Sequence, residues 1–282
     1  NNGETYIGEF KKDLAEGKGT FLSPNGDKYI GEFKNDFKEG KGEYIYSNGD
    51  KYVGDFKKDE KDGNGVMYYI NEDRYEGSYK NNVREGHGKY YYKNGSVFEG
   101  EFVGGMKEGK GVITFNDGNK YEGDFKQNAF DGNGVLYYND GNRYEGEFKN
   151  NIREGKGSIY YKNGDIFQGD FTMGKQTGKG VYIFNDGEKY EGEFNNGIME
   201  GNGIYHFNNG DRYEGEFKNG KKEGQGKIFY DLEEKLKNKE MELSESVRDR
   251  TKTESAIKSA KIYKQYVDEL QNEFNEKSKK LN

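Results

Sequence analysis

Two histidines, many carboxylates and a recurring Gly-x-Gly are the features of this sequence that could support chemistry. His87 lies between Gly86 and Gly88, and His206 lies in the apolar run 204–207. Neither histidine has a second metal-ligating residue at a usual spacing, and no Ser–His–Asp set is recognisable. The chain has no cysteine, which removes thiolate nucleophiles and cysteine-based zinc sites. We therefore predict no catalytic residue, no metal site and no cofactor, and we predict that the protein is not an enzyme.

The carboxylates recur with a fixed period of 23 residues. One acidic series begins at Glu9 and Glu32, ends at Glu216, and is interrupted once in ten members, by Ser78. A catalytic pair is expected to break a repeat pattern, so we interpret this series as a solvated ladder. Gly-x-Gly also recurs ten times, and no helix follows it, whereas a phosphate loop places its glycines before a helix N-terminus. We interpret these glycines as structural.

The period belongs to a unit of the form Tyr-x-Gly-x-Phe, a short polar link and Gly-x-Gly. Ten units follow one another without insertion, which indicates a repeat architecture. We count positions from the leading aromatic residue, which is position 1. Position 1 is occupied by Tyr6, Tyr29, Tyr52, Tyr75, Phe98, Tyr121, Tyr144, Phe167, Tyr190 and Tyr213. Position 5 is occupied by Phe10, Phe33, Phe56, Tyr79, Phe102, Phe125, Phe148, Phe171, Phe194 and Phe217.

Each unit is expected to form two antiparallel strands. Side chains two apart share a face of a strand, so positions 1, 3 and 5 lie on one face and positions 2 and 4 on the other. Position 8 is always Asp, Asn or Gly, such as Asp13 or Gly105, the types that tolerate a left-handed backbone in a tight turn. The second strand ends in pairs such as Asn25-Gly26, which favour two-residue hairpin turns. For residues 1–230 we predict a mainly β fold, a single-layer antiparallel β-meander solenoid of ten hairpins.

Aromatic rings and glycines explain how so polar a chain can fold. Only 30% of the residues are hydrophobic and 34% are charged, but 25 are Tyr and 19 are Phe. We expect the rings of the first strand to lie over the bare backbone of Gly-x-Gly in the second. Each ring then contributes roughly 4 kcal/mol for about 150 Å² buried. Ordering one residue opposes folding by about 1–1.5 kcal/mol, so no unit is expected to fold alone.

The net charge of −7 resides in residues 1–230, which contain 40 acidic and 33 basic residues. Affinity for nucleic acid comes largely from Lys and Arg on phosphates, so we predict no nucleic-acid partner. Anionic lipids attract clusters of about four to eight basic residues. Groups such as Lys57–Lys58 and Lys277–Lys280 are short or interrupted, so membrane binding stays the less favoured reading. No apolar run approaches the length of a spanning helix.

Residues 231–282 contain no Gly and no Pro and predict an α-helical tail. Residues 231–234 and 251–254 both resemble capping boxes. The second box opens a heptad-type apolar stripe with alternating steps of four and three: Ala256, Ala260, Tyr263, Val267, Leu270 and Phe274. The apolar residues of the first segment are out of register with this stripe. We expect a break near residues 248–250, with one long helix as the alternative.

The ten in-phase units resemble the MORN repeat (membrane occupation and recognition nexus). The resemblance covers residues 3–230 and departs from the usual form only in lacking Trp and in using Phe98 and Phe167 at position 1. It implies a grooved meander of hairpins and a scaffold role in cytoskeletal or ciliary assemblies, including radial spoke heads. We therefore predict a non-catalytic scaffold in the cytoplasm, in a cytoskeletal and ciliary or axonemal setting. The alternatives are a peripheral membrane tether that binds phosphoinositides, and a targeting array separated from a catalytic domain.

Two surfaces are candidates for binding other proteins of a large assembly, or a second copy. Ile7, Ile30 and Val53 occupy position 2 in the first three units, where the other seven units have Glu or Gln. They are expected to line up about 9–10 Å apart, either as ordinary strand residues or as a contact patch. The tail stripe is the second candidate. It either caps the last sheet edge, lies in the groove, or pairs with a partner helix.

Overall fold

The computed structural model describes residues 3–248 and 253–279, and the side chains within them except those of 233–234, 243–248, 253–258 and 277–279. Twenty strands form one sheet, and two helices follow. The strands are β1 (Thr5–Lys11), β2 (Leu14–Leu22), β3 (Lys28–Lys34), β4 (Phe37–Ile45), β5 (Lys51–Lys57), β6 (Glu60–Tyr68), β7 (Arg74–Lys80), β8 (Val83–Tyr91), β9 (Val97–Val103), β10 (Met106–Thr114), β11 (Lys120–Lys126), β12 (Ala129–Tyr137), β13 (Arg143–Lys149), β14 (Ile152–Tyr160), β15 (Ile166–Thr172), β16 (Lys175–Ile183), β17 (Lys189–Asn195), β18 (Ile198–His206), β19 (Arg212–Lys218) and β20 (Lys221–Phe229).

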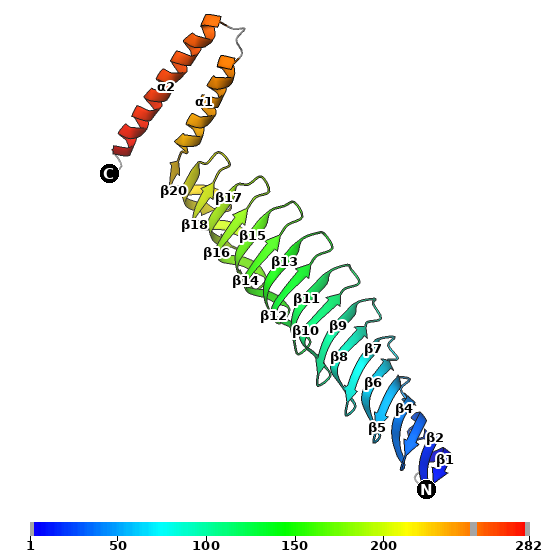
Figure 1. Ribbon diagram of the computed structural model, residues 1–282. Helices are drawn as coiled ribbons and strands as arrows, with labels where there is room; N and C mark the ends of the chain where they lie inside the picture. Colours follow the sequence, from blue (N-terminus) through cyan, green and yellow to red (C-terminus); the bar gives the residue numbers. More distant parts are fainter. Residues whose placement is uncertain (1–2, 249–252, 280–282) are drawn as a thin grey trace.

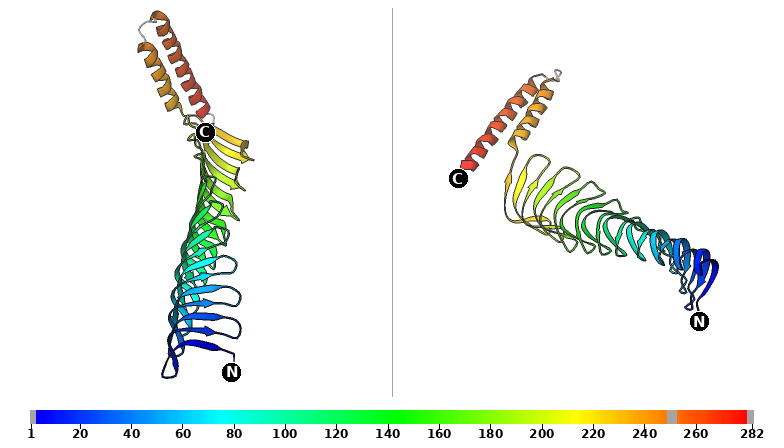
Figure 2. Two further views of the ribbon diagram at one scale, coloured as in Figure 1. Left: turned by 90° about the vertical axis from the view of Figure 1, so that its right-hand side faces the viewer. Right: turned by 60° about the horizontal axis from the view of Figure 1, so that its bottom comes forward.

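Each strand pairs antiparallel with its neighbours in sequence, so the sheet is an open meander. Figure 1 and Figure 2 show an elongated array in which the strands follow one another like ribs, with the N-terminus at one end and the helices at the other. The predicted β-meander with a helical tail is confirmed.

A two-residue turn joins the strands within a unit. Lys12 and Asp13 have φ values of 50° and 64°, and Asn150 and Asn151 have values of 48° and 68°. Two consecutive left-handed residues form the type I′ turn, whose twist matches that of the flanking strands. Position 8 has a positive φ in every unit, so the turn predicted at this position is confirmed.

The connection between units differs from the predicted two-residue hairpin. Residues 23–27 join β2 to β3. The N–H of Ser23 donates to the Asp27 carbonyl oxygen, and the N–H of Gly26 donates to the Ser23 carbonyl oxygen. Within this loop only Gly26 is left-handed, with φ of 92°, whereas a type I′ turn needs two such residues. The Asn25 side chain instead accepts the Asp27 N–H at 3.1 Å, which stabilises a longer loop.

The two strands of a unit are bulged at Gly-x-Gly. In the β5–β6 pair, Gly54 lies opposite Gly65 and Phe56 lies opposite Lys61, so residues 62–64 face Asp55 alone. Gly63 in this bulge has φ of 117°, a conformation that residues with a side chain rarely adopt. The first glycine of Gly-x-Gly therefore serves the bulge. The prediction that rings cover the whole motif is wrong for this glycine.

The second glycine lies under the ring of position 1, as predicted. Tyr52 is completely buried, and a Cβ added at Gly65 would lie 2.3–2.4 Å from its ring and hydroxyl atoms. The Tyr52 hydroxyl donates to the Asp55 carbonyl oxygen at 3.0 Å. The ring packs edge-on against Phe56 of its own unit, with centroids 5.2 Å apart, and against Tyr79 of the next unit, at 5.1 Å. The position-1 rings of the first nine units each join two units in this way.

The first unit is the exception in this row of rings. The rings of positions 1 and 5 are buried in the second to tenth units, whereas Tyr6 is half-buried and Phe10 is 65% exposed. Phe33 contacts both Tyr6 and Tyr29, at 4.8 and 5.1 Å. Phe10 contacts only the Tyr6 ring, at 5.0 Å, because β1 has no further strand beside it in the described residues. The prediction that Phe10 is a buried structural ring is therefore wrong.

The tail forms two helices, α1 (Leu232–Arg248) and α2 (Thr253–Lys279), which lie side by side (Figures 1 and 2). The alternative of one long helix is therefore wrong, and the break expected near 248–250 falls partly outside the described residues. A carboxylate of the loop between β18 and β19 binds the start of α1. Asp211 accepts the N–H of Asp231 at 2.8 Å and the Lys235 ammonium at 3.0 Å.

Candidate functional site: the two faces of the sheet

The two faces of the sheet carry different side chains. We call the face of positions 1, 5, 10 and 16 the aromatic face, and the face of positions 2, 4, 13 and 15 the polar face. The register of β5–β6 places Tyr52 opposite Met67 on the aromatic face and Val53 opposite Val66 on the polar face. Both faces can therefore be followed across the whole array from strand to strand.

Position-4 carboxylates on the polar face bind the backbone. Asp55 accepts the N–H of Asn64 at 2.9 Å, and Glu147 accepts the N–H of Lys156 at 2.9 Å. Both donors lie in the bulge, where strand pairing is interrupted. Hydrogen bonds to charged groups stabilise by about 1.5–3 kcal/mol when well formed. The interpretation of this series as a solvated ladder is therefore wrong in part, because these exposed carboxylates hold the bulge.

A second carboxylate series, at position 11, links consecutive units. Glu39 accepts the N–H of Lys58 at 3.0 Å, and Glu200 accepts the N–H of Asn219 at 3.0 Å. Each donor lies in the tight turn of the next unit. Many of the acidic residues that recur along the chain thus have backbone partners.

The residues predicted as a contact patch share one row on the polar face. Pairing across β1–β6 aligns Ile7, Thr20, Ile30, Glu43, Val53 and Val66. The exposed fraction is 64% for Ile7, 39% for Ile30 and 38% for Val53. Ile30, Val53 and Val66 also line a shallow hollow of about 760 Å³. We call Ile7, Ile30, Val53 and Val66 the N-terminal patch.

From the fourth unit onward, position 2 of this row is Glu or Gln and its glutamates are paired within the chain, while position 15 still includes apolar residues such as Val112 and Val135. Glu76 lies 2.7 Å from the Arg74 guanidinium, and Glu145 lies 3.7 Å from that of Arg143. Arg143 also stacks on the Tyr160 ring, 4.1 Å from its centroid. This part of the polar face is charged but largely compensated, in contrast to the N-terminal patch.

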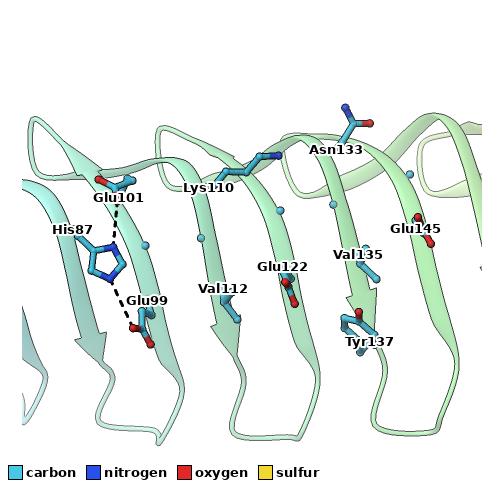
Figure 3. Close-up of a pocket in the computed structure, with 15 residues that line it drawn as sticks. His87, Glu99, Glu101, Lys110, Val112, Glu122, Asn133, Val135, Tyr137 and Glu145 are labelled. Atoms are coloured by element: carbon cyan, nitrogen blue, oxygen red, sulfur yellow. Dashed lines mark hydrogen bonds and ion pairs between the residues drawn. The ribbon is translucent and has the colours of Figure 1, made fainter.

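A hollow of about 880 Å³ extends over β8–β13 on the polar face (Figure 3). His87 lies at one end, with its ring nitrogens 3.2 Å from Glu101 and 3.7 Å from Glu99. Val112 and Val135 are among the residues that line it. Its lining contains no Ser, Thr or Cys, so His87 has no partner there of the Ser–His or Cys–His kind. Among the described residues, no group of three or more His, Cys, Asp or Glu side chains could hold a metal ion.

The aromatic face carries a row of cations that the sequence analysis missed. Position 10 is basic in six of ten units, which was the available signal, and we call these residues the cation row: Lys38, Lys61, Arg84, Lys107, Arg153 and Lys222. Each cation lies over aromatic rings. The Lys61 ammonium is 5.4 Å from the Tyr46 centroid and donates a 2.9 Å hydrogen bond to the Tyr46 hydroxyl. Such contacts stabilise by roughly 0.5–2 kcal/mol, more when desolvated.

Position 22 places an acidic residue beside these rings in several units. Asp27 accepts the Ser47 N–H at 2.8 Å with one oxygen and the Tyr44 hydroxyl at 2.8 Å with the other. Burial acts to raise the pKa of Asp27, but hydrogen bonds from the Ser47 N–H, the Tyr44 hydroxyl and Asn25 outweigh it and hold the pKa below its usual value. Asp73 and Asp165 make the equivalent pairs of bonds.

The tail stripe lies partly between the two helices. Tyr263, Val267 and Leu270 of α2, with Leu232 and Leu236 of α1, line a hollow of about 280 Å³. Tyr263, Leu270 and Phe274 are still 44–49% exposed, and Ala260 is half-buried. The side chain of Ala256 lies outside the described ones.

The tail neither caps the sheet edge nor lies along the sheet. All nine residues of β20 are exposed, and the stripe meets α1 instead. Both of these expectations are therefore wrong for the described residues. None of the described helices combines the length and apolar character needed to span a membrane.

Comparison with protein families identifies the repeat. The family model described as MORN repeat matches ten consecutive segments, residues 6–28, 29–51, 52–74, 75–97, 98–120, 121–143, 144–166, 167–189, 190–212 and 213–231. The chain belongs to the MORN-repeat family. The resemblance stated from the sequence is confirmed, with unit boundaries that begin at each leading aromatic residue. A scaffold or interaction role fits this family.

Solved structures similar to the MORN array are distant. The TCP10 domain of CPAP from Danio rerio, in complex with a STIL peptide from Danio rerio, is 15% identical, covers 80% of this chain and 98% of its own, and has a TM-score of 0.48. The TCP domain of SAS-4 from Drosophila melanogaster, in complex with a proline-rich motif of Ana2, is 17% identical, covers 80% and 97%, and has a TM-score of 0.25. No curated protein matches the sequence.

Proposed function

We propose that this MORN array is a non-catalytic scaffold that holds protein partners in a cytoskeletal, ciliary or axonemal assembly of the radial-spoke-head kind. The N-terminal patch is the observation that supports it. Exposed apolar clusters often mark protein interfaces, and this one lies on an open sheet face without a chemical set for catalysis in the described residues. The ciliary setting is proposed from the MORN family alone.

The contrast within the polar face favours a partner at its N-terminal end. Ile7, Ile30 and Val53 replace the Glu or Gln that the other units carry at position 2, and their side chains stay exposed. Apolar burial stabilises by about 25 cal/mol per Å² removed from water. The later units have their carboxylates in ion pairs, which would have to be desolvated on binding. An apolar segment of a partner therefore gains more from the N-terminal patch.

The tail is proposed as a second contact. Its half-exposed Tyr263, Leu270 and Phe274 present an apolar strip that α1 covers only in part. A partner helix, or the tail of a second copy, would complete its burial in the manner of helix-in-groove recognition.

The experiment is cross-linking mass spectrometry on the native assembly, with full-length wild type compared with Ile30→Glu. Lys41 lines the hollow beside Ile30, so its amine should cross-link to a partner in the wild type and lose that link in the variant. Ile198→Glu is the matched control, because Ile198 is 46% exposed but belongs to the ninth unit. Equal partner cross-links in wild type and Ile30→Glu would refute the patch. In a separate localisation experiment, absence of an epitope-tagged form of the chain from axonemes would refute the ciliary setting.

A further inference from the structure

The members of the cation row differ in how many acidic residues lie beside them. Two positions of the repeat bring an acidic residue near a position-10 cation: position 22 of the preceding unit and position 8 of the following unit. Lys38 has Asp27 and Asp59 at these positions, and its ammonium lies 3.5 Å from Asp59. Lys61 has Asp50 but Asn82. Lys107 has Ser96 and Asn128, so both of its acidic neighbours are replaced by neutral residues.

Lys107 consequently carries an uncompensated charge in an aromatic setting. Its ammonium lies 5.1 Å from the centroids of both Tyr92 and Phe98. In the part of the chain that the structure describes, no carboxylate forms an ion pair with it. Burial, and then the nearby positive charge of Arg84, lower the pKa of Lys107 to about 8. The Arg84 guanidinium donates to the Gly105 carbonyl oxygen at 2.6 Å. Asp73 is its acidic neighbour at position 22, but no ion pair joins Arg84 to a carboxylate among the described residues.

Ser96 shows that only the charge has been removed, and not the local fold. Ser96 is buried, and its hydroxyl oxygen accepts the Asn116 N–H at 3.1 Å, as Asp27 accepts that of Ser47 at 2.8 Å. An aspartate at position 22 has a second oxygen, and Ser96 supplies nothing in its place. Ile113 stands here in place of the tyrosine at position 16 that pairs with Asp27, but an aspartate is compatible with a missing tyrosine, because Asp50 is retained although Met67 occupies that position.

We propose that Lys107 and Arg84, with the Tyr92 and Phe98 rings beside them, bind the carboxylate of an Asp or Glu side chain on a partner segment. This inference rests on the proposed function and deepens it, because it names the chemistry of one partner contact. Opposite charges attract strongly where the surroundings are partly desolvated. The net negative charge of the array does not prevent this, because exposed charges beyond about 8 Å are screened at physiological ionic strength. The carboxylate would occupy the place that Asp50 has beside Lys61.

The test uses the full chain and small anions as probes. Lysine side-chain NMR follows the Lys107 Cε and Nζ resonances during titration with acetate, with chloride at equal ionic strength as the reference. We expect a saturable shift with acetate, accompanied by a rise in the Lys107 pKa. Ser96→Asp should abolish this response, because the fold then supplies its own carboxylate. Lys107→Met identifies the Lys107 resonances by their disappearance. Both variants are expected to fold, because Asp and Met occur at the same positions of other units, as in Asp73 and Met199.

Two outcomes would overturn the proposal. One is a response to acetate that equals the response to chloride, or that persists unchanged in Ser96→Asp. The other is tight saturation by inorganic phosphate with none by acetate, because the ligand would then be a phosphate group and not a carboxylate. Neither outcome bears on the N-terminal patch, which lies on the opposite face, so failure here is distinguishable from failure of the proposed function.

Discussion

Gly42 and Lys41 are adjacent in the chain but belong to opposite faces of the sheet. On the aromatic face, a Cβ at Gly42 would lie 2.3–2.6 Å from atoms of the Tyr29 side chain, which is completely buried. On the polar face, the Lys41 side chain is 71% exposed and reaches an Asp55 carboxylate at 2.6 Å. The difference teaches that one face fixes the fold by close packing, while the other can vary in sequence and so can encode what the array binds.

Adding a side chain at Gly42 on the aromatic face is expected to destabilise the protein strongly. The added methyl group cannot fit without moving the Tyr29 ring, and overpacking of this kind destabilises by about 1–3 kcal/mol. We expect a loss of about 3 kcal/mol, measured by urea unfolding. Lys41→Ala is the control and should lose less than about 1 kcal/mol, because exposed ion pairs contribute little. Equal unfolding midpoints for the two variants would contradict the distinction between the faces.

The hydroxyl of a position-1 tyrosine is expected to matter less than its ring. The Tyr144 hydroxyl donates to the Glu147 carbonyl oxygen at 2.9 Å, while Phe98 and Phe167 occupy the same position without one. Tyr144→Phe should therefore lose about 1 kcal/mol of stability, and Tyr144→Ala about 3–5 kcal/mol. Urea unfolding of both variants measures these two losses of stability. A comparable loss in both would show that the hydrogen bond, and not ring packing, dominates.

Acid should weaken the aromatic face through its position-22 carboxylates. Burial acts to raise the pKa of Asp165, but hydrogen bonds from the Tyr182 hydroxyl, Asn163 and the Asn185 N–H outweigh it and lower the pKa. A carboxylate with a lowered pKa in the folded state adds stability above its unfolded pKa of about 3.9. That stability is lost as pH falls through the folded value.

Asp165→Asn should therefore be less stable than wild type at pH 6 and should lose less stability between pH 6 and pH 3. Asparagine occurs naturally at the same position as Asn142, where its side-chain oxygen accepts the Lys162 N–H at 2.8 Å, so the variant keeps an acceptor for the loop. Urea midpoints at both pH values measure the effect. Parallel pH profiles would exclude Asp165 as a contributor.

The smallest effect is expected on the charged part of the polar face. Glu145→Gln removes one partner of the exposed Arg143 pair and should change stability by less than about 0.5 kcal/mol. A larger loss in urea unfolding would mean that the charge pairs of this face also hold the fold, and the contrast between the faces would weaken.

The strict 23-residue period made most of the array predictable. Tyr52 and Gly65 were predicted to meet because large rings and bare glycines alternate at fixed positions. The left-handed turn at Asp13 was predicted because its position accepts only Asp, Asn or Gly. The Asn25-Gly26 pair led to the wrong turn type. The same pair occurs both in two-residue hairpins and in longer loops, and only the φ of the asparagine distinguishes the two.

The 23-residue period did not predict which side chains and backbone groups bind one another. Asp55 reads as a solvated carboxylate because nothing in the sequence reveals the bulge whose N–H it accepts. Lys107 was overlooked because a basic residue in one unit looks ordinary until its missing acidic neighbours, Ser96 and Asn128, are placed beside it. The pairing of α1 with α2 was missed because their apolar residues do not share one heptad register.

The Lys58 N–H donates to Glu39, and equivalent bonds join most consecutive units, although Thr177 interrupts the series. Duplication or loss of 23 codons at a junction that has this bond would therefore leave the junction chemically unchanged. The length of this protein can evolve in whole-unit steps, and the spacing between whatever it holds at its two ends can change without any redesign of its interior.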